Sequence, residues 1–191
     1  ILYGQSEFSN IINVEPRLYE RTFIVNGVSK AFSMTGWRIG YGAGDPALIE
    51  SISKIQSQST TNPCSISQIA AKHALDSNKD FLEEWIRKFE QRKEYLINFF
   101  QSIKEFKTFI PDGAFYLFIS CEGFLYKSDR KGFLVKSDVD FAEYLLTDAG
   151  VAVVPGIAFG MSPYFRISYA TSLEKLKKAC NLIEKSVDKL K

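Results

Sequence analysis

Two hydrophobic periodicities divide this chain into helical and extended segments. Four segments place apolar residues at the intervals of one helix face, which predicts amphipathic helices at 46–61, 65–77, 80–103 and 172–190. Short runs of β-branched and aromatic residues predict strands in five further segments: 22–25, 107–110, 115–120, 151–154 and 165–169. This mixture, without any internal repeat, predicts an α/β protein.

Local capping signals mark the ends of two helices. Asp45 is a suitable N-cap, and Pro46 after it occupies the first helical position. Ser137 and Asp140 form a sequence similar to a capping box. They predict a helix that ends at Gly150, a residue suited to the left-handed helix end.

The predicted secondary structure changes after the long helical segment at 80–103. Helices dominate before it and strands follow it, which predicts two domains, 1–96 and 97–191. The run at 22–25 is β-branched and aromatic and predicts a buried strand that ends in a turn. The segment 122–136 is polar and punctuated by glycine, so we expect it to be an exposed excursion.

The composition indicates a folded protein without a nucleic-acid or membrane partner. Of 191 residues, 46% are hydrophobic, which is enough for a packed core. The formal net charge of +2 is too small for a nucleic-acid-binding face. No apolar run approaches the roughly 20 residues of a membrane-spanning helix.

Cysteine and histidine are too sparse for several kinds of site. Cys64, Cys121 and Cys180 lie far apart and form no CxxC pair, so neither a disulfide framework nor a zinc site is expected. His73 is the only histidine, and its alanine-rich surroundings favour an ordinary helical residue. We therefore expect no metal and a reducing, cytoplasmic setting.

A lysine lies in the loop after the strand at 22–25, and its amine is the first candidate for chemistry. Lys30 would act as a nucleophile only when unprotonated, and desolvation lowers the pKa of a lysine for that purpose. Three apolar neighbours are candidates to exclude water from the amine: Phe32, Met34 and Trp37. Such a lysine is suited to form a Schiff base with a carbonyl cofactor.

A second cation and several glycines follow the lysine. Arg38 has the planar fork that binds phosphate oxygens, and together the two cations suit pyridoxal phosphate. Glycines allow a backbone to approach a ligand closely at four positions: Gly36, Gly40, Gly42 and Gly44. By spacing alone, a surface loop with two ordinary cations fits equally well. A dinucleotide fingerprint fits less well, because Asp45 stands where the third glycine belongs.

The class I aminotransferases have a cofactor-lysine signature that residues 29–41 resemble, SKAFSMTGWRIGY. Further motifs follow in the order of that family: QSTTNP at 58–63, DGAFY at 112–116, VAVVPG at 151–156, FG at 159–160 and FRISYATS at 165–172. The chain looks most like bacterial aspartate aminotransferases of the subgroup that often also accepts prephenate. The resemblance implies the C-terminal part of their fold, with the end of the large α/β cofactor domain at 1–96 and the small α+β domain at 97–191.

The same resemblance assigns roles to individual residues. Lys30 is similar to the lysine that binds pyridoxal 5'-phosphate covalently and moves the substrate proton. Arg38 matches the arginine that holds the cofactor phosphate, and Ser29 offers a hydroxyl next to the lysine. Arg166 matches the arginine that binds the substrate α-carboxylate, and Phe159 is a candidate for the wall of the substrate pocket. An arginine on an apolar strand also needs an anion on chemical grounds, although a structural ion pair would supply one.

The implied reaction transfers an amino group between L-aspartate and 2-oxoglutarate, with a small amino acid and a 2-oxo acid as partners. The resemblance also implies a homodimer. Other family residues on the cofactor ring lie upstream of Ile1, so we expect a truncated chain that is inactive alone. Two alternatives remain: another enzyme of this fold, such as an aromatic or prephenate aminotransferase or a β-lyase, and a non-catalytic remnant or interaction module.

Overall fold

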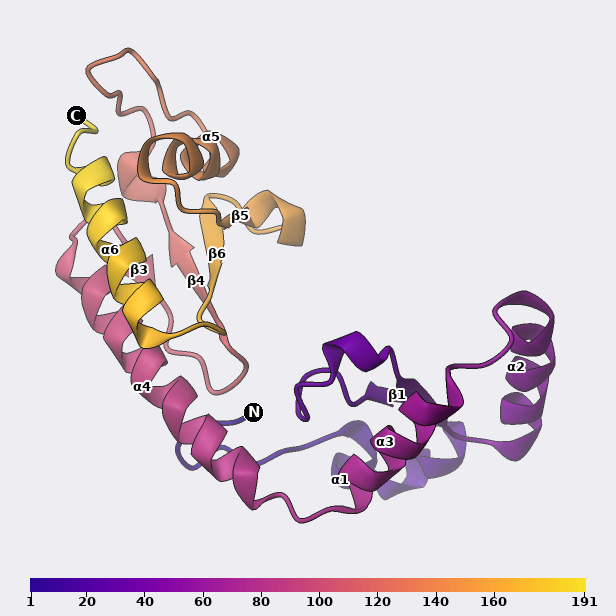
Figure 1. Ribbon diagram of the computed structural model, residues 1–191. Coiled ribbons are helices and arrows are strands. Elements are labelled where there is room, and N and C mark those ends of the chain that lie inside the picture. The colour runs from indigo at the N-terminus through magenta and orange to yellow at the C-terminus, as the bar shows by residue number, and fades with distance from the viewer. The chain divides into compact units, whose positions relative to one another are not determined.

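The computed structural model describes residues 1–191, which separate into two compact units (Figure 1). One unit consists of residues 7–84, and the other of residues 1–6 together with 85–191. The division falls within the long helix α4 (Asp80–Ser102). The domain boundary at 96/97 concerns the longer proteins that the chain resembles, and it stays a prediction.

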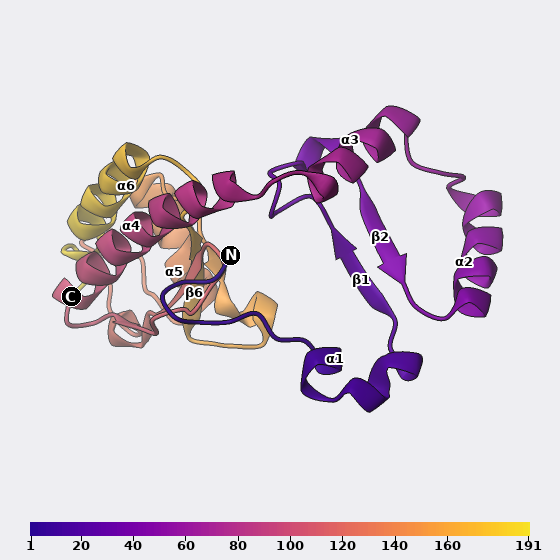
Figure 2. The same cartoon turned by 90° about the horizontal axis from the view of Figure 1, so that it is seen from below.

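A two-stranded antiparallel ribbon organises the unit of residues 7–84 (Figure 2). Its strands are β1 (Ile24–Gly27) and β2 (Gly40–Ala43), with Gly27 opposite Gly40. The remaining elements are α1 (Ile11–Val14), two 3₁₀ turns (Pro16–Arg21 and Thr35–Trp37), α2 (Pro46–Ser59) and α3 (Ser65–Asp76). Asp45 caps α2 with its carboxylate, which confirms the N-cap prediction.

The strand β2 was not predicted, because its glycines disfavour a strand. The structure shows what Gly42 of this strand and Gly44 just after it do. A Cβ at Gly42 would lie 2.5 Å from the Phe23 ring, and one at Gly44 would lie 2.7 Å from it. These glycines therefore make room for Phe23 rather than for a ligand.

The prediction that the strand at 22–25 is buried is wrong for this chain. All of β1 except Gly27 is exposed, and Val25 is 77% exposed. A strand is buried when other layers cover both faces of its sheet, and this ribbon has only two strands. Burial in this unit instead centres on the loop after β1, where Val28, Met34 and Ile39 pack with Ala71 of α3.

A four-stranded antiparallel sheet and three helices form the other unit. The strand order is β3-β4-β6-β5, and the elements are β3 (Lys107–Thr108), β4 (Tyr116–Ser120), a 3₁₀ turn (Glu122–Phe124), α5 (Asp138–Tyr144), a π-helical turn (Leu145–Ala149), β5 (Val154–Pro155), a 3₁₀ turn (Gly156–Phe159), β6 (Tyr164–Ser168) and α6 (Leu173–Val187). Helices α4 and α6 lie side by side (Figures 1 and 2).

Side chains on the sheet alternate between a buried and a half-buried face. Leu117 and Ile119 of β4 and Phe165 and Ile167 of β6 are buried in the core with residues of α4, α5 and α6. The residues between them, including Arg166, lie on the other face.

The first residues of the chain complete this core. Tyr3 is 4% exposed, and its hydroxyl lies 3.1 Å from that of Tyr169 and bonds to the carbonyl of Ala114. The ammonium of Lys93 lies over the Tyr3 ring, 4.2 Å from its centroid. Residues 1–6 therefore belong physically with residues far along the chain.

The capping prediction for the helix at 137–150 is confirmed. The Ser137 hydroxyl accepts a hydrogen bond from the Asp140 amide and donates one to its carboxylate. Gly150 adopts the left-handed conformation, with φ 67°, at the end of the π-helical turn.

The segment 122–136 is not simply an exposed excursion. Phe124 and Val135 are buried and belong to the core. The Phe124 ring packs against the rings of Phe106 and Phe141. Ser128 and Lys191 exchange two backbone hydrogen bonds of 3.0 Å each. The polar composition of the segment 122–136 therefore reflects only its exposed residues.

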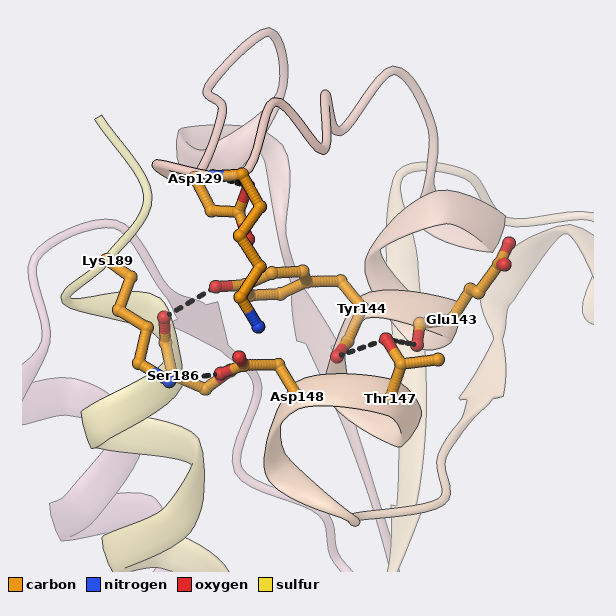
Figure 3. Close-up of polar contacts among 8 residues, drawn as sticks. Asp129, Glu143, Tyr144, Thr147, Asp148, Ser186 and Lys189 are labelled. Atoms are coloured by element: carbon orange, nitrogen blue, oxygen red, sulfur yellow. Dashed lines mark hydrogen bonds and ion pairs between the residues drawn. The ribbon is translucent and has the colours of Figure 1, made fainter.

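A polar cluster joins the turn after α5 to the end of α6 (Figure 3). The Tyr144 hydroxyl donates to the carbonyl of Ser186 over 3.0 Å, and the Ser186 hydroxyl donates to Asp148 over 2.8 Å. The Lys189 ammonium lies 2.6 Å from the same carboxylate, whose side chain is 12% exposed. The hydrogen bond from Lys189 lowers the pKa of Asp148.

We predict that Asp148→Asn lowers the free energy of unfolding by about 1–3 kcal/mol at neutral pH. Because the folded-state pKa of Asp148 is lowered, its stabilisation is present above the unfolded pKa and is lost as the pH falls through the folded value. Urea unfolding at neutral pH and in acid measures both effects. The exposed Glu143, whose side chain points away from the cluster in Figure 3, supplies the control Glu143→Gln. Equal losses in the two variants, or a difference that persists in strong acid, would contradict the prediction.

Candidate active site

The lysine singled out by the sequence lies in the loop that closes the β1–β2 ribbon. Lys30 follows Val28, which is fully buried and anchors the loop. The Phe32 amide donates to the Val28 carbonyl over 3.3 Å, and the Ser33 amide donates to the Lys30 carbonyl over 3.2 Å. Since Gly27 pairs with Gly40, the whole loop 28–39 lies at one end of the ribbon.

Arg38 occupies the same loop in a left-handed backbone conformation, with φ 56° and ψ 47°. This conformation costs roughly 1–2 kcal/mol for a residue with a side chain, so packing must hold it. The neighbouring Ile39 is buried and Met34 is 9% exposed, which supplies that packing. The guanidinium donates to the Thr35 carbonyl over 3.0 Å and forms no ion pair with a carboxylate of the chain. Most of its N–H donors therefore remain available to an anion.

The apolar surroundings expected to exclude water from Lys30 do not form in this chain. Lys30 is exposed, and Trp37 is 44% exposed. Met34 packs with Ala71, and the Phe32 ring lies 6.2 Å from that of Phe81, so both side chains serve the core of this unit. The prediction was wrong because spacing in a loop does not reveal which way its apolar side chains turn.

The donors of this loop nevertheless fit a cofactor that carries an aldehyde and a phosphate. Lys30 supplies a primary amine, Arg38 a cation without an internal carboxylate, and Ser29 a half-buried hydroxyl between Val28 and Lys30. A Cβ at Gly36 would meet no atom within 4 Å, so the loop backbone is open at this position. The fit rests on the chemistry of these groups.

Arg166 lies in the middle of β6 in the other unit, directly opposite Phe118 of β4 and Val154 of β5. Its guanidinium lies 4.3 Å from the centroid of the Tyr116 ring and 4.4 Å from that of Phe159. It forms no ion pair with a carboxylate of the chain. No structural ion pair therefore forms at Arg166 within this chain, and the cation is available to an anion from outside it.

The loop that carries Phe159 is fixed by a buried carboxylate. Asp138, at the first turn of α5, is 2% exposed and accepts hydrogen bonds from the Ile157 amide over 2.7 Å and the Ser162 hydroxyl over 2.6 Å. A Cβ at Gly156 would lie 2.0 Å from the Met161 carbonyl oxygen, so the tight loop requires glycine there. Phe159 itself is 46% exposed.

The predicted site residues thus fall into two groups. Ser29, Lys30 and Arg38 share the loop of one unit, and Arg166 and Phe159 share the sheet face of the other. Two residues were given no role by the sequence reasoning: Tyr116, whose ring contacts Arg166, and Asp138, which holds the loop of Phe159. The pairing of β4 with β6 would have pointed to Tyr116, but a single sequence does not fix that register.

Comparison with known proteins decides the family. A model of the family "Aminotransferase class I and II" matches residues 1–183. The chain belongs to this aminotransferase family. Aminotransferases of this family generally depend on pyridoxal phosphate, bind amino-acid and oxo-acid substrates, and are typically dimeric. The prediction of an aspartate aminotransferase-type fold is confirmed.

Individual aminotransferases resemble the chain over its whole length. It is 49% identical over 188 residues to a probable aspartate/prephenate aminotransferase of Rickettsia conorii, covering 98% of the chain and 47% of that protein. The crystal structure of the aspartate aminotransferase from Rhizobium meliloti matches with a TM-score of 0.95 at 48% identity, covering 100% of the chain and 48% of that structure. The aromatic aminotransferase from Pyrococcus horikoshii matches with a TM-score of 0.85 at 34% identity, covering 98% of the chain and 48% of that structure.

The chain spans about half the length of the curated aminotransferases it matches. Its helices include none that is both long and apolar enough to cross a membrane. Among its histidine, cysteine and acidic side chains, no group of three or more is placed to hold a metal ion.

We predict that Asp138→Ala lowers the free energy of unfolding by about 2 kcal/mol, because the Ile157 amide and the Ser162 hydroxyl lose their acceptor. Urea unfolding measures the loss. Glu143→Ala removes an exposed carboxylate from the same helix and should change stability by less than about 0.5 kcal/mol. Equal stability of the two variants would show that the buried carboxylate does not hold the loop.

Proposed function

We propose that this chain carries part of the active site of an aspartate aminotransferase, which exchanges an amino group between L-aspartate and 2-oxoglutarate. The observation that carries the proposal is Arg166, a half-buried arginine that contacts two aromatic rings and has no carboxylate partner in the chain. It occurs in a chain 48% identical to an aspartate aminotransferase of Rhizobium meliloti. An α-carboxylate is the anion common to all substrates of such a reaction.

The loop 28–39 would hold pyridoxal 5'-phosphate, which when bound supplies an electron-withdrawing ring for the reaction. The Lys30 amine would hold the cofactor through its aldehyde and, once the substrate amine has displaced it, would move the proton at the substrate Cα. Arg38 would bind the phosphate through its N–H donors, and the Ser29 hydroxyl would add a further donor.

The sheet face of the other unit would hold the substrate. Arg166 binds the α-carboxylate in a bidentate pair, which fixes the orientation of the Cα–H bond. Phe159, which is 46% exposed, presents an apolar wall beside that carboxylate and limits the access of water.

The choice of substrate side chain has a second candidate. The relative from Rickettsia conorii is named a probable aspartate/prephenate aminotransferase, and it is 49% identical to this chain. Prephenate aminotransfer is therefore the favoured second activity. An aromatic aminotransferase or β-lyase keeps the same lysine and arginine, and substrate screening distinguishes them.

The active unit is proposed to be a homodimer, as is typical of the family. Because the chain spans about half the length of its relatives, we expect it to bind ligands without turning substrate over when it is tested alone. Its contribution is the lysine, the phosphate-binding arginine and the carboxylate-binding arginine.

We predict that pyridoxal phosphate added to the chain and fixed with borohydride labels Lys30 selectively. Peptide mass mapping after digestion identifies the labelled lysine. Lys30→Ala should abolish the selective label, whereas Lys54→Ala, which removes an exposed lysine of α2 paired with Glu50, should leave it unchanged. Labels spread evenly over surface lysines would contradict the proposed role of Lys30.

Arg38→Ala should raise the cofactor concentration that half-saturates this labelling by roughly 10- to 100-fold, because a charge-assisted phosphate contact contributes about 1.5–3 kcal/mol. Titration by absorbance measures the shift. Arg17→Ala, which removes an exposed arginine of the same unit paired with Glu15, is the matched control. Similar titration curves for the two variants would remove Arg38 from the phosphate site.

A further inference from the structure

Two aromatic side chains from separate elements contact the guanidinium of Arg166. The Tyr116 ring, from the first residue of β4, has its centroid 4.3 Å from the guanidinium carbon, and the Phe159 ring has its centroid 4.4 Å from it. We call these two rings the aromatic clamp. The proposed function uses Arg166 and Phe159 but assigns nothing to Tyr116.

The clamp leaves the hydrogen-bonding edge of Arg166 available. Aromatic rings interact with the face of a guanidinium through cation–π attraction and stacking, while its five N–H donors lie in the plane. The Arg166 guanidinium forms no hydrogen bond or ion pair within the chain, so these donors are available to a carboxylate while the guanidinium lies over both rings. The two rings also displace water from around the guanidinium, so a carboxylate that arrives meets a cation that is already partly dehydrated.

Both rings are themselves held in place. Tyr116 lies opposite Ser168 in the β4–β6 pairing, and the next residue, Leu117, is buried in the core. Phe159 belongs to the loop that Asp138 fixes through Ile157 and Ser162. A ring on rigid backbone restricts the long arginine side chain more effectively than one on a mobile loop.

Cross-strand geometry explains why Tyr116 reaches Arg166. Phe118 is the direct partner of Arg166, and Tyr116 lies two residues away on the same face of β4. Such a diagonal neighbour is about 7–8 Å away at the backbone, within reach of two long side chains. A small residue at 116 would leave that side of the guanidinium open to water.

We propose that Tyr116 is a positioning residue that holds Arg166 in its carboxylate-binding orientation. The proposal rests on the proposed function, since it takes Arg166 as the carboxylate-binding group. Its ligand class is a substrate carboxylate, and its effect is preorganisation, because an arginine that is already fixed loses less freedom when the ligand binds.

The test uses the whole chain with labelled arginine side chains and maleate, a dicarboxylate that cannot undergo amino transfer. NMR of the arginine Nε–Hε groups reads the clamp directly, because ring currents shift the Arg166 signal. Tyr116→Phe keeps the ring and should retain that shift. Tyr116→Leu should move the signal toward those of the exposed arginines, and its maleate dissociation constant should rise roughly 3- to 30-fold.

Two further variants separate the possible failures. Phe109→Leu removes an exposed ring near the same sheet that has no arginine over it, and it should leave both readouts unchanged. Arg166→Lys should abolish maleate binding. The proposed function of Arg166 is wrong if the unaltered chain does not bind maleate. It is also wrong if Arg166→Lys binds maleate as well as the unaltered chain does. In either case the positioning role of Tyr116 fails with it. If maleate binding depends on Arg166 but Tyr116→Leu binds equally well, or keeps the ring-current shift, only the positioning role is wrong.

Discussion

The pairing of β4 with β6 is the constraint on which the unit of residues 1–6 and 85–191, here the C-terminal unit, depends. In this register every second residue enters the core, where Leu117 and Phe165 pack with the helices, and the residues between them face the other way. Burial of the core side chains holds the register, because a slip of one residue would turn that apolar set outward. The same register sets Arg166 beside aromatic rings, so the energy that folds the sheet also positions the cation.

The lysine loop is held by a different and smaller set of contacts. Its core consists of a few buried residues around Val28 and Ala71, and Arg38 adopts a conformation that an ordinary residue avoids. Left-handed residues held by neighbouring packing are a common way to store local strain at functional sites. The loop therefore combines an exposed lysine with a backbone anchored by a small buried cluster.

Sequence reasoning succeeded where the determining interactions are local. The cap at Asp45 and the reciprocal pair of Ser137 and Asp140 involve residues two or three positions apart, so the sequence displays both partners. It failed where the partner is distant. The strand β2 depends on Phe23 covering its glycines, and the buried Phe124 depends on rings of other segments. The candidate site divides in the same way: motifs identify Lys30, Arg38 and Arg166, but only the register of the sheet reveals Tyr116.

The path of the chain has a practical consequence for anyone who wants to study the C-terminal unit alone. Its core includes Tyr3, which bonds with Tyr169 across 166 positions of sequence, while residues 7–84 form a unit of their own between these partners. The unit of residues 7–84 is thus inserted into the unit of residues 1–6 and 85–191, and closing that loop carries an entropic cost that grows only slowly with its length. A fragment that starts at residue 85 would leave the Tyr169 hydroxyl without its neighbour and part of the core open to water. A fusion that joins residues 1–6 to residue 85 through a short linker keeps every segment of the core and closes a much smaller loop.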